Sequence, residues 1–431
     1  MRLDIRTNPL VLTLFEVKGN ARSCLLTEPL WGIPFNLYAP FVTLYMYALG
    51  VNDRQIGFLL SISMVLQVIS ASLGGIMTDK YGRRRVTFLV DLIAWSVPVL
   101  IWMLAQDFWW FFAAAVFNSL FQMTSTSWQC LMVEDCDPKL LVNLYTWVNI
   151  SGLLAVFFAP LSALFVAKFS LVATVRVLYA VAFILMTVKF FILYHFSTET
   201  GQGKKRMLET KDQSIWQLFV GYRDIFRKMA KSRQMLLIMA VFVLINIVNI
   251  PVGNFFSLYI TQNVGIPEKY VALFPIGRAM VMLLFIFVFQ TMFNRFRYRP
   301  VLLWGIMLYI ASHVMLLLAR PGNGWFIVGY TVLEAAAFAL VIPRRDSLGV
   351  LFIDKEDRAR VMSLIVVVML AVSSPFGSLI GWLSSIDRRY PFMLNIGIFA
   401  VLALIVSTSR AISQHDCLAE AGLAEAEPVG Q

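Results

Sequence analysis

GGIMTDKYGRRR, residues 74–85, is a short polar stretch inside a strongly apolar chain. An apolar run that begins at Ile56 precedes it and another that begins at Val86 follows it, each about long enough to cross a bilayer. A charged turn between two such runs predicts a membrane hairpin whose cations stay on the cytoplasmic side. The paired glycines at its start allow a neighbouring helix to approach closely, and Gly82 permits a tight turn.

The order of residues in this turn is more specific than its charge. Asp79 can pair with Arg83 or Arg84, or can lie at the positive N-terminal end of another helix. The pattern G-x-x-x-D-K-x-G-R-R-R resembles the signature loop between the second and third helices of the major facilitator superfamily. A generic cytoplasmic loop would need the cations but not the glycines and the acid. The matching residues are Gly75, Asp79, Lys80, Gly82, Arg83, Arg84 and Arg85.

The composition is that of an integral membrane protein. Hydrophobic residues make up 59% of the chain and charged residues 14%, with a mean hydropathy of +0.75. Soluble domains average roughly 45–50% apolar and 25% charged residues. The first 22 residues carry charges among their apolar residues and lack the pattern of a cleavable signal peptide, so we expect the first helix to target the chain.

The net charge of +11 reports topology and not a nucleic-acid partner. About 27 of the 36 Lys and Arg residues fall in segments that are cytoplasmic when both termini are inside. We therefore expect a multi-pass protein of the plasma or inner membrane with cytoplasmic termini. The four cysteines have no metal-ligand spacing and are expected to be reduced: Cys24, Cys130, Cys136 and Cys417.

Hydropathy predicts about twelve spans, each near the roughly 20 residues that a helix needs to cross the hydrocarbon. They run approximately over 26–50, 55–78, 86–105, 108–132, 141–167, 171–195, 235–262, 267–291, 300–319, 325–349, 360–384 and 391–410. The predicted fold is an all-α integral membrane protein of two pseudo-symmetric six-helix bundles. Its parts are a cytoplasmic segment (1–25), a first bundle (26–196), a linker (197–234), a second bundle (235–410) and a cytoplasmic tail (411–431), which we expect to be disordered.

The two halves repeat at a constant offset of about 214 or 215 residues, as in transporters built from two parallel repeats. Asp79 to Arg85 corresponds to Asn294 to Pro300, and Pro160 corresponds to Pro375. Between the halves, apolar residues recur at helical spacing from Ile215 to Met229, with basic residues on the other face. This segment is predicted to lie flat on the inner leaflet, with binding of a calmodulin-type partner as the alternative.

Ionisable residues inside spans are costly in lipid and are by default functional or paired. Arg278 and Glu334 lie at the same predicted depth, in spans that are neighbours in the resembled fold. A Glu held ionised by an Arg could take a proton when substrate removes the Arg, or the two could form a permanent structural pair. Glu28 and Asp91 are further candidates for coupling, although each could instead cap or brace a helix. Lys189 is expected to reach the headgroups from a span end.

Uncharged polar residues follow single helical faces in several spans. In the resembled fold, spans one, four, seven and ten line the substrate cavity, which makes these positions candidates for binding substrate. Polar residues also join helices in membranes, so each has a structural alternative. The candidates are Asn36, Tyr38, Asn118, Gln122, Asn246, Asn249, Arg278 and Glu334.

No hydrolytic triad, metal cluster or Walker loop is apparent, so we expect a non-enzyme without cofactors that draws on a proton gradient. The three histidines, at 195, 313 and 415, are isolated from one another in the sequence. The stretch at 199–202 departs at two positions from the P-E-T-x-G motif of sugar porters, which argues against sugar transport.

The resemblance implies a monomeric secondary transporter of small molecules that works by alternating access. Asp79 and the following arginines, with Glu134 or Asp135 below the fourth span, would latch its cytoplasmic side. The alanine and proline pattern at 155–163 is similar to an antiporter motif and favours proton-coupled efflux of a small, partly apolar compound. The alternatives are proton-coupled uptake of an anionic nutrient or metabolite, a lipid flippase, and a sensor that does not transport.

Overall fold

The computed structural model describes residues 9–137, 139–212, 232–285, 288, 298–351 and 358–409, and these residues form helices and turns without a strand. The amphipathic segment at 215–229, the turn at 294–297 and the tail at 411–431 lie outside the described residues. The chain divides into two compact units. Unit 1 holds Met1–Ile225, Pro267–Pro275 and Val366–Ser385, and unit 2 holds Phe226–Ile266, Ile276–Ile365 and Ile386–Gln431.

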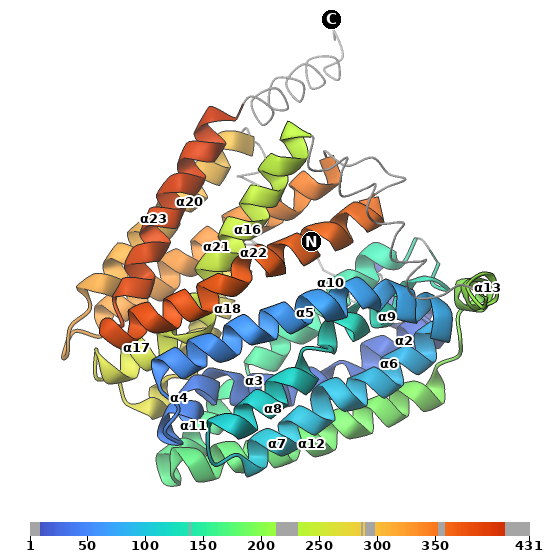
Figure 1. Cartoon of the computed structure of the whole chain (residues 1–431), viewed down its shortest axis with the longest axis horizontal. Coiled ribbons are helices and arrows are strands. Elements are labelled where there is room, and N and C mark those ends of the chain that lie inside the picture. Colours follow the sequence, from blue (N-terminus) through green and yellow to red (C-terminus); the bar gives the residue numbers. More distant parts are fainter. Residues whose placement is uncertain are drawn as a thin grey trace, which may run out of the picture. The chain divides into compact units, whose positions relative to one another are not determined.

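Unit 1 contains the helices that carry the signature loop (Figure 1). They are α1 (Pro9–Glu16), α2 (Gly19–Thr27), α3 (Pro29–Tyr38), η2 (Ala39–Phe41), α4 (Val42–Ala48), α5 (Asp53–Tyr81), α6 (Arg83–Asp91), η3 (Leu92–Ser96), α7 (Val97–Leu104), α8 (Phe108–Asn118), α9 (Phe121–Val133), α10 (Leu141–Val156), α11 (Ala159–Lys168), α12 (Leu171–Phe196), α13 (Gly201–Glu209) and η4 (Glu268–Tyr270). Pro29 and Pro40 interrupt the first predicted span because proline has no N–H for the helical ladder. The segment η3 is one turn of π-helix directly after Asp91.

Unit 2 is built on α16 (Arg233–Asn254), α17 (Phe256–Gln262), α18 (Leu273–Leu284), α20 (Tyr298–Leu318), α21 (Trp325–Leu351), α22 (Arg358–Ile386) and α23 (Tyr390–Thr408). The first residues of α18 and most of α22, from Val366 to Ser385, belong to unit 1. Helix α20 lies between α21 and α23, and an added Cβ at Gly305 would lie only 2.6 Å from Val341 Cγ2. Unit 2 therefore packs α20 against α21 at a point where only glycine fits.

Nine helices among the described residues are long and apolar enough to cross a membrane. The predicted first and fourth spans fall on shorter, interrupted helices, and the eighth continues past the described residues. The count of twelve therefore stays a prediction. The nine are Asp53–Tyr81, Arg83–Leu104, Asn143–Lys168, Leu171–Phe196, Arg233–Asn254, Tyr298–Leu318, Trp325–Asp346, Val361–Ile386 and Tyr390–Thr408.

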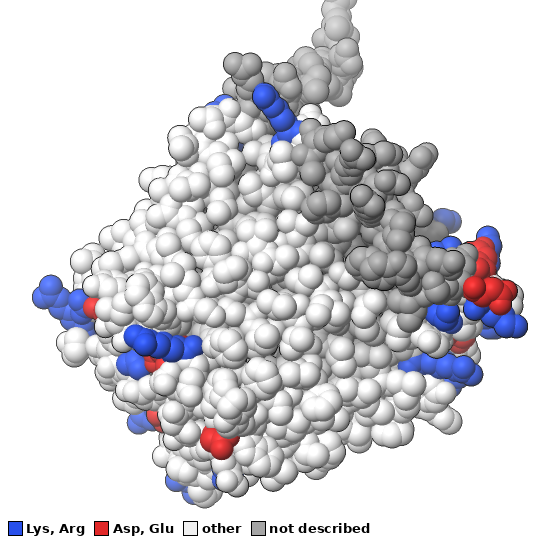
Figure 2. Space-filling view, viewed as in Figure 1, with Lys and Arg blue, Asp and Glu red and all other residues white. Residues whose placement is uncertain are grey.

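The surface suits a lipid environment. On the face seen in Figure 2, charged side chains gather in small groups near the margins and a broad uncharged area lies between them. Large apolar side chains such as Leu164 and Leu404 are 67% and 62% exposed. Exposed apolar surface on this scale would be unfavourable in water and is expected where helices meet hydrocarbon.

Close helix packing in unit 1 confirms that Gly74, the first of the paired glycines, allows a neighbouring helix to approach. A Cβ at Gly74 of α5 would lie 3.2 Å from the Cα of Met123 in α9. Further along α5, a Cβ at Gly57 would lie 2.6 Å from Gly377 O and from Gly381 Cα, both in the part of α22 that belongs to unit 1. Serine side chains join the same two helices, because Ser61 Oγ accepts from Ser378 N at 2.7 Å.

Candidate functional site

The signature loop closes on itself through a buried arginine. Gly82 ends α5 with φ +90°, a backbone conformation that favours glycine, and so turns the chain into α6. Arg83 then lies 4% exposed, with Nη2 3.1 Å from Asp79 Oδ1 and 3.0 Å from Glu134 Oε1. The predicted pairing of Asp79 with Arg83 is confirmed, and Glu134 is brought to the same guanidinium.

The segment after α12 completes this network through Glu199 and Thr200, a contact that no sequence pattern predicted. The Glu199 carboxylate accepts hydrogen bonds from the backbone N–H groups of Arg83 and Arg84 at 2.9 and 3.0 Å. The Thr200 hydroxyl donates to Glu134 at 2.5 Å. The start of α6 has unpaired backbone N–H groups and the positive end of the helix dipole, and both favour an anion. Gly82 at the N-cap has no side chain to bond these groups, so Glu199 caps the helix instead. An acid directly after span six was the only signal in the sequence.

Helix α13 holds the acid of the signature loop from outside the spans. Arg206 Nη2 donates to Asp79 Oδ2 at 2.8 Å, and its Nη1 donates to Glu209 at 2.9 Å. Hydrogen bonding to Asp79, and then the charges of both carboxylates, raise the pKa of the Arg206 guanidinium. Asp135 accepts from Gly201 N at 3.2 Å, whereas Arg85 is exposed. The loop residues therefore meet α9, α13 and the chain between α12 and α13, all within unit 1.

A second charged cluster lies among the spans of unit 1. Glu28 lies between α2 and α3, and its Oε2 is 2.9 Å from Lys189 Nζ of α12. The lysine side chain is 6% exposed, and the rings of Trp31 and Trp128 lie 5.7 and 5.9 Å from Nζ. The prediction that Lys189 extends to the headgroups is therefore wrong, because a partly buried carboxylate and two aromatic rings hold its ammonium inside the unit.

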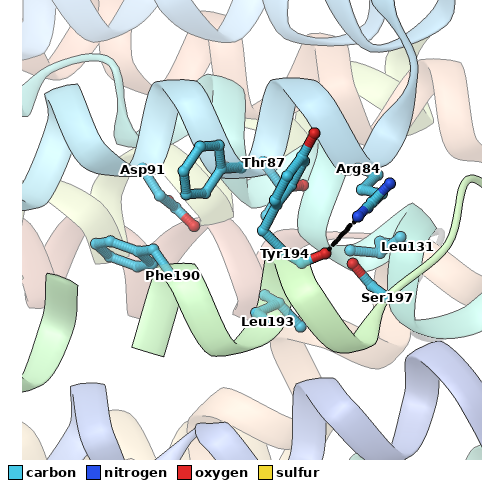
Figure 3. A pocket seen from close by; sticks show the side chains of 9 residues that line it. Arg84, Thr87, Asp91, Leu131, Phe190, Leu193, Tyr194 and Ser197 are labelled. Atoms are coloured by element: carbon cyan, nitrogen blue, oxygen red, sulfur yellow. Dashed lines mark hydrogen bonds between the residues drawn. The ribbon is translucent and has the colours of Figure 1, made fainter. Parts of the chain in front are cut away.

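Asp91 belongs to the same cluster and also lines a pocket. It is 6% exposed and lies close enough to Thr124 of α9, Lys189 and Glu28 to interact with them electrostatically. The pocket lies between α6, α9 and α12, with Asp91 and Phe190 towards one end and Arg84 and Ser197 towards the other (Figure 3). Arg84 is held there by two bonds to Tyr194 O and by the Tyr194 ring, 4.0 Å from its Cζ.

In unit 2, the two ionisable residues predicted at a common depth are directly paired. Arg278 Nε lies 2.7 Å from Glu334 Oε2, and Arg278 Nη2 lies 3.0 Å from Oε1. Glu334 is 3% exposed, whereas the arginine side chain is 34% exposed. The ring of Phe338 lies 4.5 Å from Arg278 Cζ. The pairing is confirmed, and the arginine is the more exposed of the two residues.

Comparison with known proteins decides the family. The model described as the MFS_1 like family matches residues 35–394. The chain belongs to the major facilitator superfamily. Consistent with this, it is 28% identical over 132 residues to the uncharacterized MFS-type transporter YqjV of Bacillus subtilis (strain 168), a match that spans 29% of this chain and only 31% of that relative.

Solved structures give the same fold for this superfamily member. The nucleoside transporter NupG has a TM-score of 0.68 at 15% identity, covering 90% of this chain and 98% of its own. The human organic anion transporter MFSD10 (TETRAN) has a TM-score of 0.64 at 14% identity, covering 93% and 100%. The peptide transporter POT in complex with sulfate has a TM-score of 0.71 at 13% identity, covering 92% and 94%. The protein is a multi-pass membrane transporter of the superfamily.

The remaining polar candidates of this superfamily member differ in their surroundings. In unit 1, the Asn36 amide donates to Gly32 O within its own helix, and the Asn118 amide joins α8 to Ala94 O at 2.9 Å. Tyr38 is 2% exposed within an aromatic group, and Gln122 is partly exposed. In unit 2, Asn249 is partly exposed, and the Asn246 Nδ2 atom is buried without a partner among the described residues.

His313 has no other histidine near it in the sequence, but in unit 2 its ring is hydrogen-bonded on both nitrogens. Its Nδ1 lies 2.9 Å from Tyr309 O, and its Nε2 lies 3.1 Å from Asn395 Nδ2, which also donates to Val248 O. These contacts join α16, α20 and α23 and place an N–H at Nδ1 and an acceptor at Nε2. The neutral ring is therefore a structural link between three helices. Within the described parts of the chain, no group of three or more His, Cys, Asp or Glu side chains could hold a metal ion.

Proposed function

We propose that this transporter moves a small organic anion together with a proton, with Arg278 as the anion-binding residue and Glu334 as the proton carrier. The observation that carries the proposal is the asymmetry of their pair. Both Glu334 oxygens are bonded to Arg278, and Glu334 is 3% exposed while the arginine is 34% exposed. An incoming anion therefore meets the guanidinium and not the carboxylate.

Anion and proton binding would then support each other. The two bonds to Glu334 use Nε and Nη2, so a carboxylate or phosphate can approach the guanidinium from Nη1 and compete for the donors. A buried Glu334 that loses its cation would carry an uncompensated charge, which favours its protonation. Since the anion promotes uptake of the proton, the two move in the same direction. This favours the symport reading over proton-coupled efflux by exchange.

Buried polar groups of unit 2 add to the proposed site. Tyr330 of α21 lies close enough to Glu334 and Arg278 to interact electrostatically, and its hydroxyl is buried without a partner among the described residues. The Asn246 amide, also unpartnered, lies on α16, which packs against α21. Buried polar groups without partners are rare and suit a ligand or water. MFSD10, named an organic anion transporter, shares the fold alone at 14% identity, so the proposal depends on these residues.

The experiment compares binding of benzoate with that of its neutral isostere benzamide, and of phenyl phosphate, by thermal stabilisation of purified protein. We expect the anions to stabilise the wild type and the matched control Arg345→Met, since Arg345 lies further along α21 and pairs with Asp346. The charge-neutral double variant Arg278→Met with Glu334→Gln should show no stabilisation. Equal stabilisation of the double variant, or by benzamide, would overturn the proposal.

A second candidate is efflux of a partly apolar compound in exchange for protons. An aromatic group in unit 1 favours it, because Trp31 stacks on Phe35 at 4.9 Å and meets the edge of Trp95 at 5.0 Å. The antiporter-like pattern supports it less, because Ala155 lies where it packs on helix α3: a Cβ at Gly32 would be 3.3 Å from Ala155 Cβ. Proton movement in proteoliposomes separates the candidates. Symport acidifies the side that receives the substrate, whereas exchange for protons makes the side that receives the substrate alkaline.

A further inference from the structure

The cluster in unit 1 contains one more carboxylate than it has cations. Glu28 and Asp91 both act on the single ammonium of Lys189, which lies 2.9 Å from Glu28. Lys189 is 5% exposed and Asp91 6%. An uncompensated charge in a region of low dielectric costs several kcal/mol, so a buried cluster of this kind lowers its energy by holding a proton.

Other groups around Asp91 leave this excess charge in place. Thr124 offers a hydroxyl, and the Cys24 thiol lies in the field of all three charged residues without adding a cation. Arg84 lines the same pocket, but its guanidinium is committed to Tyr194, with Nε and Nη2 at 3.0 and 2.7 Å from the carbonyl oxygen. Lys189 is therefore the cation that Asp91 and Glu28 must share.

We propose that Glu28, Asp91 and Lys189 form a proton-binding site in unit 1, separate from the Arg278–Glu334 pair, in which Lys189 pairs with one carboxylate and the other carries the proton. In the arrangement described here Lys189 is on Glu28, so the proton is on Asp91. If the ammonium moves to Asp91, the proton moves to Glu28. The site deepens the proposed function by adding a second proton, but it needs no substrate and can be tested without one.

The narrow pocket of Figure 3 leads towards Asp91 but has no room for a water molecule. It extends along α12 from Ser197, whose hydroxyl is buried and unpartnered among the described residues, to Asp91. A hydronium ion gives its proton to an Asp91 carboxylate oxygen and leaves as water, a step that requires the packing around this pocket to open. The π-helical turn that begins directly after Asp91 is a local departure from the regular ladder, of a kind that is frequent at functional sites.

The test is the infrared carbonyl band of protonated carboxyl groups, recorded at neutral pH on purified full-length protein that carries Glu334→Gln to remove the carboxyl of unit 2. We expect one buried band that Asp91→Asn removes. Glu28→Gln should remove it as well, because Lys189 can then pair with an ionised Asp91. Lys189→Met should increase the band about twofold, since two carboxylates without a cation both take protons.

The Glu28→Gln result is decisive because that variant removes a different carboxyl from the one that carries the proton. A band that survives Glu28→Gln, or no band in the parent, would overturn the proposal even if Lys189→Met fails to fold. Asp53→Asn is the matched control, since Asp53 is a buried carboxyl of unit 1 that is 4% exposed and accepts from Ser384. It should leave the response to Glu28→Gln unchanged. Because Glu334 is absent throughout, failure of the anion proposal would not change this result.

Discussion

The charged groups of the two units differ in their balance. Unit 2 pairs one arginine with one glutamate through two hydrogen bonds, and the arginine remains 34% exposed. Unit 1 shares one lysine between two carboxylates, and both Lys189 and Asp91 are almost fully buried. A balanced pair changes its protonation only when something competes for the cation. An unbalanced cluster favours a bound proton at rest, so the two proposals assign the response to a ligand to unit 2 and the response to pH to unit 1.

Breaking the balanced pair should have the largest effect. Arg278→Met leaves Glu334 buried without a cation, and removing one partner of a buried pair typically costs about 3–5 kcal/mol. We expect a loss of that order in the free energy of unfolding, measured by thermal or denaturant unfolding in detergent. Adding Glu334→Gln should recover most of it. If the double variant is no more stable than Arg278→Met, the pair is not the cause of the loss.

Removing the shared lysine should cost less, because in the proposed site Asp91 already carries a proton and the carboxylate that loses its cation, Glu28, is 15% exposed, against 3% for Glu334. We expect Lys189→Met to lower the free energy of unfolding by about 2 kcal/mol near neutral pH. The loss should shrink as pH falls, because acid supplies the protons that neutralise Glu28 and Asp91. It should grow as pH rises, since both carboxylates then lose protons without a cation. Unfolding measured between pH 5 and 9 checks this, and a loss independent of pH would remove the contrast between the units.

Loosening the start of α6 should affect unit 1 selectively. Glu199→Gln replaces a charged cap with a neutral amide and should cost about 1 kcal/mol of stability. Because unit 2 has no part in this contact, anion binding at Arg278 should remain unchanged. Glu209→Gln is the matched control, since Glu209 is 42% exposed and pairs with Lys205 and Arg206 of α13. If both variants lose a similar amount of stability, the cause is the loss of a negative charge from residues 197–212 and not the loss of the cap on α6.

The smallest effect on stability is expected at the surface of the loop. Arg206 and Asp79 are 37% and 25% exposed, and ion pairs of this kind contribute about 0–1 kcal/mol. Asp79→Asn should nevertheless reduce turnover more than substrate affinity if the loop latches the transporter. Arg206→Gln tests whether α13 holds Asp79 in place. This variant should alter turnover without changing the infrared carbonyl band expected from Asp91. Unchanged turnover in both variants would count against the latch.

The position of an ionisable residue within a predicted span was enough to pair Arg278 with Glu334 but not to place Lys189. Arg278 and Glu334 could be matched because both lie in the middle of spans, where an unpaired charge is costly. The same argument gave the wrong surroundings for Lys189. The residue lies near the end of a predicted span, which suggested that its ammonium reaches the headgroups, but the sequence does not show in which direction the side chain points. Only the packing of α12 against α3 brings it to Glu28.

Local motifs were informative where the chain supplies both partners within one turn. Asp79 and Arg83 are four residues apart across Gly82, so their pairing follows from spacing. Glu199 caps the same turn from another helix end, and Asn395 reaches His313 across 82 residues, which no periodicity encodes. The substrate-binding roles of Asn36, Tyr38, Asn118, Gln122, Asn246 and Asn249 remain predictions, as does the number of spans.

The cap on α6 also sets an order for synthesis. The first amides of that helix are bonded by a carboxylate that lies 116 residues further along the chain. A ribosome must therefore finish α12 and begin the linker before the signature loop can close. A nascent chain that ends at Phe196 would leave these amides open, whereas one that extends through Glu209 would cover them. The first six predicted spans therefore reach their final contacts only after the ribosome has begun to make the segment that follows α12.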